Sequence, residues 1–257
     1  MLLAIDTSTN YASIALADDD TTLVELNWRV GQRHGAETLE RVRWLLRGQN
    51  VEMAQLDGLA VALGPGSFNG VRVAVATAKT LAFALNIPIY GIPTLDVIAW
   101  GARLSRDPIW ALLDAGRGEV YAACYDARHT TDDAPSGWSP RPFMSGDESG
   151  PYGIIAPETV AERVNGPVTI TGEWRPATHA ALIAALGERA RFTSSFSPRR
   201  GAWLAELAAI RARRGASDNV DALEPLYLRR PNITTSARMP SAPEADRSGG
   251  EESAHAL

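Results

Sequence analysis

The order of hydrophobic patterns in the first 92 residues is the feature that most constrains the fold. Short apolar segments, separated by turns rich in Thr, Asn and Asp, predict three strands over 2–6, 12–17 and 23–26. Helical and strand patterns then alternate, with helices over 35–47 and 70–86 and strands over 56–63 and 89–92. Because strands joined through a helix pair in parallel, this order predicts an antiparallel meander attached to a parallel section.

This order is that of a ribonuclease-H-like unit, and the pattern then starts again. The later predicted elements are a helix (94–104), a hairpin (110–114 and 119–125), a long loop (127–153), a strand (168–171), a helix (202–214) and an extended segment (225–229). The hairpin indicates a second, degenerate copy of the first unit. We therefore predict an α/β protein with two ribonuclease-H-like lobes, over 1–106 and 107–235, followed by a disordered tail over 236–257.

Composition narrows the classes of function. The net charge of −5 gives no global positive field that would attract nucleic acid, so another chain is expected to hold most of any RNA substrate. Cys124 is the only cysteine, which excludes an internal disulfide and a multi-cysteine metal site. No apolar stretch reaches the roughly 18 residues of a membrane span, and the N-terminal apolar run is too short for a signal peptide. These features predict a cytoplasmic protein that does not enter the membrane.

Two hairpin tips are candidate phosphate sites. Asp6, Thr7 and Ser8 follow the first strand, where a carboxylate and hydroxyls beside free amides could hold a phosphate or a hydrated magnesium ion. Asp114 and Gly116 could form a second phosphate hairpin facing the first. The alternative at both places is an ordinary polar turn.

The glycine-rich loop 64–70 lies between a strand and a helix, where backbone amides and the helix dipole favour an anion. Gly66 and Ser67 are its candidate phosphate contacts. The loop lacks the Lys of a Walker A motif and has the wrong spacing for a dinucleotide fingerprint. A tight turn that brings two backbones close together is the alternative.

The sequence offers no catalytic residue and no metal site. The four histidines are at least 50 positions apart, and Ser67 has no evident general base. An ATPase of this kind would also need a glycine motif near the C-terminus that binds adenosine. The only Gly-Gly pair, Gly249-Gly250, falls in the predicted tail. Independent ATPase activity is therefore not expected.

The helix over 70–86 is apolar on two opposite faces. One face carries Val71, Val75, Ala78 and Ala82, and the other carries Val73, Ala76, Thr80 and Phe83. Such a helix must be covered twice, once by the sheet and once by another layer of this chain or by another chain. Trp44 lies off the apolar stripe of the preceding helix and could anchor a partner.

A local group of arginines is the remaining feature, and it consists of Arg189, Arg191, Arg199, Arg200, Arg211, Arg213 and Arg214. These side chains could contact tRNA phosphates, or they could simply form a solvated surface.

Several of these segments together resemble the TsaB family, also called YeaZ. They are residues 3–9, 64–72, Asp114 with 117–121, and 226–229. The resemblance covers about residues 1–230 and implies two lobes of the actin-like ATPase type. One departure is Asn69, where the family commonly has Thr.

The resemblance implies a scaffold that pairs with the catalytic paralogue TsaD, works with TsaE, and reaches tRNA through the complex. The assembly forms threonylcarbamoyladenosine next to the anticodon of tRNAs that read codons beginning with A. The expected partner interface lies on the first two long helices and comprises Leu39, Trp44, Val73, Ala76, Thr80 and Phe83. The subunit needs no cofactor itself, although the complex could hold ATP or ADP with magnesium.

Two alternatives from other classes stay open. One is a free-standing enzyme, either a kinase of the actin fold or a glycopeptidase-like enzyme. The other is a homodimer formed through the same helix face when the partner is absent.

Overall fold

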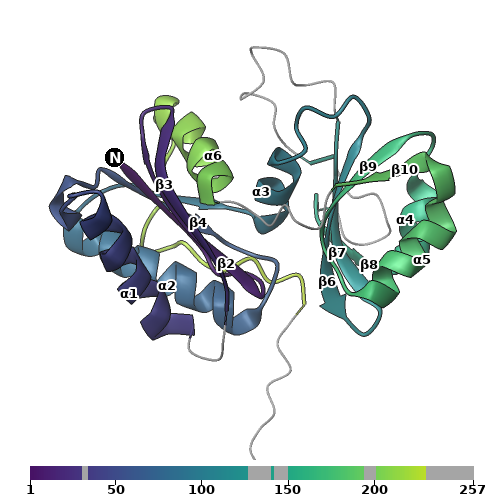
Figure 1. The fold of residues 1–257 in the computed structure, drawn as a ribbon, viewed down its shortest axis with the longest axis horizontal. Coiled ribbons are helices and arrows are strands. Elements are labelled where there is room, and N and C mark those ends of the chain that lie inside the picture. Colours follow the sequence, from purple (N-terminus) through teal and green to yellow (C-terminus); the bar gives the residue numbers. More distant parts are fainter. Residues whose placement is uncertain (31–33, 127–139, 142–149, 194–200, 230–257) are drawn as a thin grey trace, which may run out of the picture.

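The computed structural model describes residues 1–30, 34–126, 140–141, 150–193 and 201–229. These residues form two lobes, each built on a five-stranded sheet with helices on its faces (Figure 1). None of their helices is both long and apolar enough to cross a membrane.

The first lobe has the predicted meander and parallel section. Its strands lie in the order β3-β2-β1-β4-β5, and they are β1 (Leu2–Asp6), β2 (Tyr11–Asp18), β3 (Thr21–Arg29), β4 (Gly58–Ala62) and β5 (Ile89–Ile92). The first three are antiparallel, whereas β1, β4 and β5 run parallel. Helices α1 (His34–Gly48) and α2 (Phe68–Leu85) and the short 3-10 turn η1 (Met53–Gln55) connect the later strands. The meander and helix crossovers therefore confirm the ribonuclease-H-like order.

The second lobe repeats this topology in full. Its elements are β6 (Ile109–Gly116), β7 (Glu119–Tyr125), β8 (Gly153–Ile155), α4 (Pro157–Arg163), β9 (Val168–Glu173), α5 (Pro176–Leu186), η4 (Gly187–Arg189) and β10 (Ala190–Phe192). The order β10-β9-β6-β7-β8 is the first sheet read from the other end, with the same parallel and antiparallel pairs. The lobe is thus complete in strand order, with edge strands β8 and β10 of three residues each. The predicted loop 127–153 and the predicted tail fall mostly or wholly outside the described residues.

The last helix of each half packs on the sheet of the other half. Helix α3 (Thr94–Trp100) follows β5, and its Leu95 and Ile98 join the core that contains Ile109 of β6. Helix α6 (Gly201–Arg213) follows the second lobe, and its Leu204 packs with Ala4 of β1. The predicted second-lobe range, 107–235, thus includes a helix that covers the first sheet. The two halves are interlocked.

Asp96 on α3 links this helix to the second lobe. Its Oδ1 accepts hydrogen bonds from the hydroxyls of Tyr125, at 2.6 Å, and Tyr152, at 2.7 Å. Burial raises the pKa of this carboxyl to about 6, against the opposing effect of the two hydroxyl donors.

Helix α3 ends at Trp100, earlier than predicted, because residues 101–104 form turns.

Candidate functional site

A cleft of about 480 Å³ lies between the lobes, and both hairpin tips and the glycine-rich loop border it. Its lining residues are Thr9, Asn10, Tyr11, Gly66, Ser67, Leu113, Asp114, Ala115, Gly116, Tyr121, Glu173, Trp174 and Arg175. Four of the predicted phosphate residues, Gly66, Ser67, Asp114 and Gly116, therefore meet at one cavity. The other three do not line it.

Asp6, Thr7 and Ser8 are buried beneath the cleft wall. Asp6 accepts hydrogen bonds from the Ser8 amide, at 2.9 Å, and from the Ser8 hydroxyl, at 2.6 Å. Thr7 donates its hydroxyl to the carbonyl of Gly70, and Thr94 donates its hydroxyl to Ser8. These polar groups stabilise the turn, which agrees with the alternative of a structural hairpin tip.

The glycine-rich loop packs backbone to backbone against this tip. A Cβ atom on Gly66 would lie 2.0 Å from the carbonyl oxygen of Ser8, and one on Gly70 would lie 2.0 Å from that of Thr7. The amide of Ser67 also donates to the Ser8 carbonyl at 2.7 Å. Both glycines are needed because no side chain fits between the two segments. The close-approach interpretation of the loop accounts for their spacing.

The second hairpin tip holds its carboxylate in place with an arginine. Asp114 accepts a hydrogen bond from the Gly116 amide at 2.7 Å, and Arg175 donates to its two oxygens at 2.5 and 2.9 Å. Burial alone would raise the pKa of Asp114, but the Arg175 and Gly116 hydrogen bonds outweigh it and hold the pKa below its usual value. No sequence signal identified Arg175, which precedes α5 as its N-cap residue and lies 61 positions from Asp114 along the chain.

The charged side chains that line the cleft bear on whether it could hold a nucleoside triphosphate. Among its lining residues, Asp114 and Glu173 are acidic and Arg175 is basic, and Arg175 is already bound to Asp114. The carboxylate that would face a magnesium ion at the first tip, Asp6, is covered by Ser8. Arg175, the basic residue among those that line the cleft, is thus already engaged by Asp114 rather than available to a phosphate chain. Within the described ranges, no group of three His, Cys, Asp or Glu side chains gathers at a metal-binding distance.

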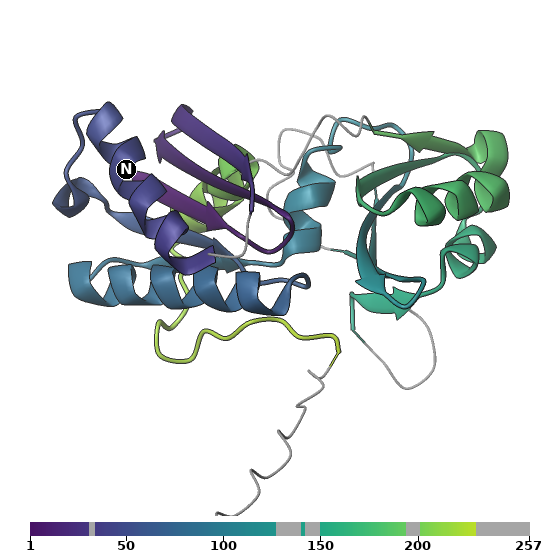
Figure 2. The same ribbon diagram turned by 60° about the horizontal axis from the view of Figure 1, so that its bottom comes forward.

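The segment 218–229, named here the strap, joins the two lobes below α2 (Figure 2). Lys79 of α2 donates to the backbone carbonyls of Asp221 and Leu223, and the Leu226 amide donates to the backbone carbonyl of Leu63. At its far end Arg229 donates to the carbonyl of Ala115, at 3.1 Å, and pairs with Glu119 at the second hairpin. The strap thus ties α2 to the second lobe.

The outer face of α1 and α2 is exposed. We use this name for Leu39, Trp44, Val73, Ala76, Thr80 and Phe83. Phe83 is 75% exposed and Trp44 is 61% exposed. Ala76 and Thr80 are exposed as well, and Leu39 and Val73 are half-buried. The opposite stripe of α2, with Val71 and Ala78, is buried on the sheet.

The exposed stripe of α2 that contains Ala76 and Thr80 continues to the start of the helix. Phe68 and Arg72 precede Ala76 at intervals of four residues, and both are exposed. The ring of Phe68 lies 5.3 Å from that of Tyr227 on the strap, and the Arg72 guanidinium lies 5.1 Å from the Phe68 centroid. This cluster was not predicted from the sequence, although the four-residue spacing could have revealed Phe68 and Arg72.

Most described arginines of the predicted basic group have protein partners. Arg189 donates to two carbonyls at the end of α5 and to one at the end of α4, and Arg191 pairs with Asp107. Arg211 pairs with Asp218, and Arg213 pairs with Asp20. These contacts favour the structural interpretation of the group, while Arg199 and Arg200 lie outside the described residues.

Comparisons with known proteins agree with this architecture. A family model described as TsaD, tRNA N6-adenosine threonylcarbamoyltransferase, matches residues 29–137. The tRNA threonylcarbamoyladenosine biosynthesis protein TsaB of Bacillus subtilis strain 168 is 37% identical over 128 residues, which cover 50% of this chain and 56% of the relative. TsaB of Escherichia coli K12 is 33% identical over 176 residues, which cover 67% of this chain and 68% of the relative.

The match thus spans little more than half of the length of the Bacillus relative. Among solved structures, YeaZ from Pseudomonas aeruginosa superposes with a TM-score of 0.70 at 26% identity, covering 88% of this chain and 99% of that chain. Two lobes of one strand order that share a cleft form the actin-like ATPase type of fold. On its identity to the Escherichia relative and its fold, the chain belongs to the TsaB family.

Proposed function

We propose that this chain is a non-catalytic subunit that binds a TsaD protein in the cytoplasm. Together they would form threonylcarbamoyladenosine next to the anticodon of tRNAs reading codons that begin with A. The observation that carries the proposal is the exposed outer face of α1 and α2, with Trp44 at 61% and Phe83 at 75% exposure. The choice of reaction is supported by the TsaB relatives, which are named for threonylcarbamoyladenosine biosynthesis.

The physical argument for a partner begins with the two aromatic side chains. Burying a large apolar side chain stabilises a complex by roughly 1.5–3 kcal/mol. Aromatic anchors surrounded by small residues are typical of the few positions that dominate a protein–protein interface. Ala76 and Thr80 provide such small neighbours on α2, so a partner helix can approach closely.

The match to the TsaD family model supports the choice of partner. It covers residues 29–137, which include both α1 and α2. A TsaD protein would therefore present a related pair of helices. Two such faces can pack about an approximate two-fold axis as a four-helix contact. The same symmetry would allow a homodimer of this chain when TsaD is absent.

In this proposal the nucleotide and most RNA contacts belong to the complex. The Asp114–Arg175 pair and the covered Asp6 argue against ATP or ADP with magnesium in the cleft of this subunit. The net charge of −5 argues against strong tRNA binding by this chain alone. TsaE and tRNA would then join through TsaD or through a surface shared with it.

Reconstitution of tRNA modification with and without this chain tests the proposal. We expect modification to require the chain, and modification at full rate without it would refute the scaffold role. The double variant Ala76→Glu and Thr80→Glu should abolish co-purification with TsaD, because two carboxylates would be buried without partners. A matched double variant on α5, Ile183→Glu with Ala184→Glu, should bind normally, since both residues are exposed in the other lobe.

A further inference from the structure

A groove of about 670 Å³ lies between the β2–β3 hairpin and α6, separate from the cleft and from the outer face of α1 and α2. It is lined by Ala17, the segments 19–25 and 202–203, Ala205, Glu206, Ala209 and Arg213. The groove exists because one face of the first sheet carries α1 and α2, whereas the opposite face carries α6, which packs mainly over β1 and β2. The β3 side of that face is left open along the described chain.

The first part of β3, residues 21–25, lines this groove. β3 has nine residues and is the last strand of its sheet among the described residues. An edge strand directs every second pair of backbone N–H and C=O groups away from its neighbour, and these groups can pair with another extended chain. The corresponding edge strand of the second lobe, β8, has three residues and offers a much shorter template.

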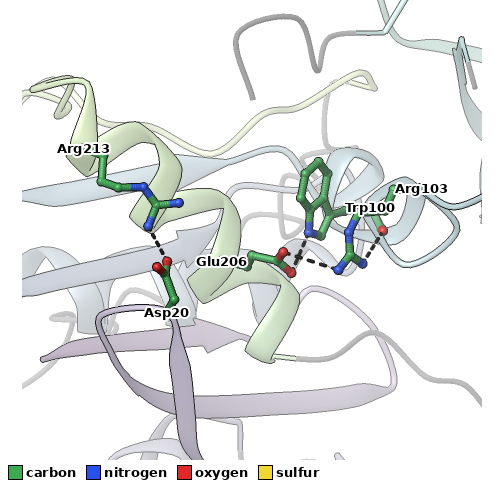
Figure 3. Close-up of polar contacts among 5 residues, drawn as sticks. All are labelled: Asp20, Trp100, Arg103, Glu206 and Arg213. Carbon is green, nitrogen blue, oxygen red and sulfur yellow. Dashed lines mark hydrogen bonds and ion pairs between the residues drawn. The ribbon is translucent and has the colours of Figure 1, made fainter. Parts of the chain in front are cut away.

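The charges of the groove are predominantly acidic. Asp19, Asp20, Glu25 and Glu206 line it, against Arg213 as the basic lining residue. Figure 3 shows that Arg213 is bound to Asp20 and that Glu206 accepts hydrogen bonds from Trp100 and Arg103. Asp19 is exposed at the hairpin turn. Side chains that enter the groove from an added strand would therefore gain from positive charge.

We propose that the edge of β3 and this groove bind an extended segment of another protein that carries Arg or Lys at alternate positions. The segment adds to the sheet as a sixth strand through main-chain hydrogen bonds. Its basic side chains point toward α6 and meet Asp19, Glu25 and Glu206. The intervening side chains lie on the other face of the sheet.

A second copy of this chain is a poor occupant of the same edge. Glu25 is the central residue of β3, which spans Thr21–Arg29. Antiparallel pairing of two β3 strands about their centres would place two Glu25 side chains opposite each other. Like charges in that position are destabilising, so the strand is protected against self-pairing while it stays open to a basic strand.

Three synthetic ten-residue peptides test the proposal on the full chain. The first alternates Arg with Val, the second replaces each Arg with Glu, and the third is the Arg peptide with alternate backbone amides methylated. Fluorescence anisotropy should show at least tenfold weaker binding of the second and third peptides. Hydrogen exchange followed by NMR should show new protection of β3 amides with the first peptide. Equal binding of the methylated peptide, or unchanged β3 exchange, would overturn strand addition.

Variants locate the contact. Asp19→Asn combined with Glu206→Gln should weaken binding of the Arg peptide about tenfold. Glu224→Gln, on the exposed part of the strap, should leave binding unchanged. Thermal unfolding of each variant checks that the fold is intact, and Asp19→Asn alone serves if the Glu206 variant is destabilised. Unchanged binding in the groove variants, or a chain that dimerises through β3 in sedimentation experiments, would show that the proposal is wrong.

Discussion

The two lobes share one strand order but differ in what their outer helices do. In the first lobe α1 and α2 have 15 and 18 residues and expose Trp44 and Phe83. In the second lobe α4 and α5 have 7 and 11 residues, and Ile183 is the large apolar side chain that they expose. Repetition of a fold therefore does not repeat its surface. Docking capacity is concentrated on the longer helices.

The hairpin tips of the two lobes also differ, in how they are held in place. The first tip is closed by the backbone of the glycine-rich loop, which leaves no space for a Cβ at Gly66 or Gly70. The second tip is held by side chains, through Arg175 and Arg229, and Gly116 has open space around it. One tip thus depends on backbone packing and the other on ion pairs. Five substitutions, compared with control variants, test these contrasts.

Gly70→Ala should have the largest effect. The added Cβ would meet the Thr7 carbonyl, and since both groups are fixed backbone we expect a loss of stability of more than about 3 kcal/mol. Gly116→Ala should cost only about 1 kcal/mol, from its positive φ of 75°. Urea unfolding measures both, and similar losses would mean that the two tips are not held differently.

Asp96→Asn should change the pH dependence of stability. The folded-state pKa of Asp96, about 6, lies above its ordinary value of 3.8, so the folded protein binds this proton more tightly. The resulting stabilisation is fully present below about pH 4 and is lost as the pH rises through 6, by up to about 3 kcal/mol. Asn stays neutral and can still accept both tyrosine hydrogen bonds. We therefore expect the variant to be more stable at pH 7.

Asp114→Asn provides the opposite case. Because the folded-state pKa of Asp114 is lowered, its stabilisation is present above the unfolded-state pKa and is lost as the pH falls through the folded-state value. Urea unfolding at several pH values between roughly 3 and 7, which span the usual pKa values of carboxyl groups, compares the stability of the two variants with that of the wild type. Parallel pH profiles for all three proteins would contradict the assigned pKa shifts.

Phe83→Ala should weaken binding to TsaD by about 2 kcal/mol, roughly thirtyfold, without reducing the stability of the free chain. The reason is that Phe83 is 75% exposed and contributes little to the core. Calorimetric titration with TsaD measures the change. Ile183→Ala on α5 is the matched control, and equal weakening by that variant would mean that the second lobe also docks.

Arg229→Gln should have the smallest effect, about 1 kcal/mol or less, because its ion pair with Glu119 is partly solvated. Faster hydrogen exchange in the turn between β6 and β7, followed by mass spectrometry, is the expected signature. Arg72→Gln, which contacts the Phe68 ring instead, should leave that turn unchanged. If Arg229→Gln also leaves the turn unchanged, the strap does not hold the second lobe.

The first lobe could be predicted from the sequence because its elements are long and periodic. The helix predicted over 70–86 is Phe68–Leu85, and the strand predicted over 89–92 is Ile89–Ile92. In the second lobe β8, α4, α5 and β10 were missed. β8 and β10 have three residues each, which is too short for an alternating pattern. α5 is apolar on nearly every side, so its hydrophobic residues show no helical periodicity.

The site was harder to predict because its geometry depends on contacts between distant segments. The sequence left open whether the loop 64–70 binds an anion or brings two backbones together, and it could not show that the neighbour of Gly66 is Ser8. Asp6 had the right residue type for a phosphate site, yet hydrogen bonds from Ser8 enclose it. The outer face of α2 was predictable, because helical spacing alone separates Val71 from Ala76 and Phe83.

The exchange of α3 and α6 between the halves has a consequence for biosynthesis. The strands of the first sheet are complete at Ile92, yet the helix that covers one of its faces ends at Arg213. At typical translation rates that helix is made on the order of ten seconds later. During that interval Ala4 and Ala15 have no cover, and the nascent chain on the ribosome should be a substrate for chaperones until α6 emerges.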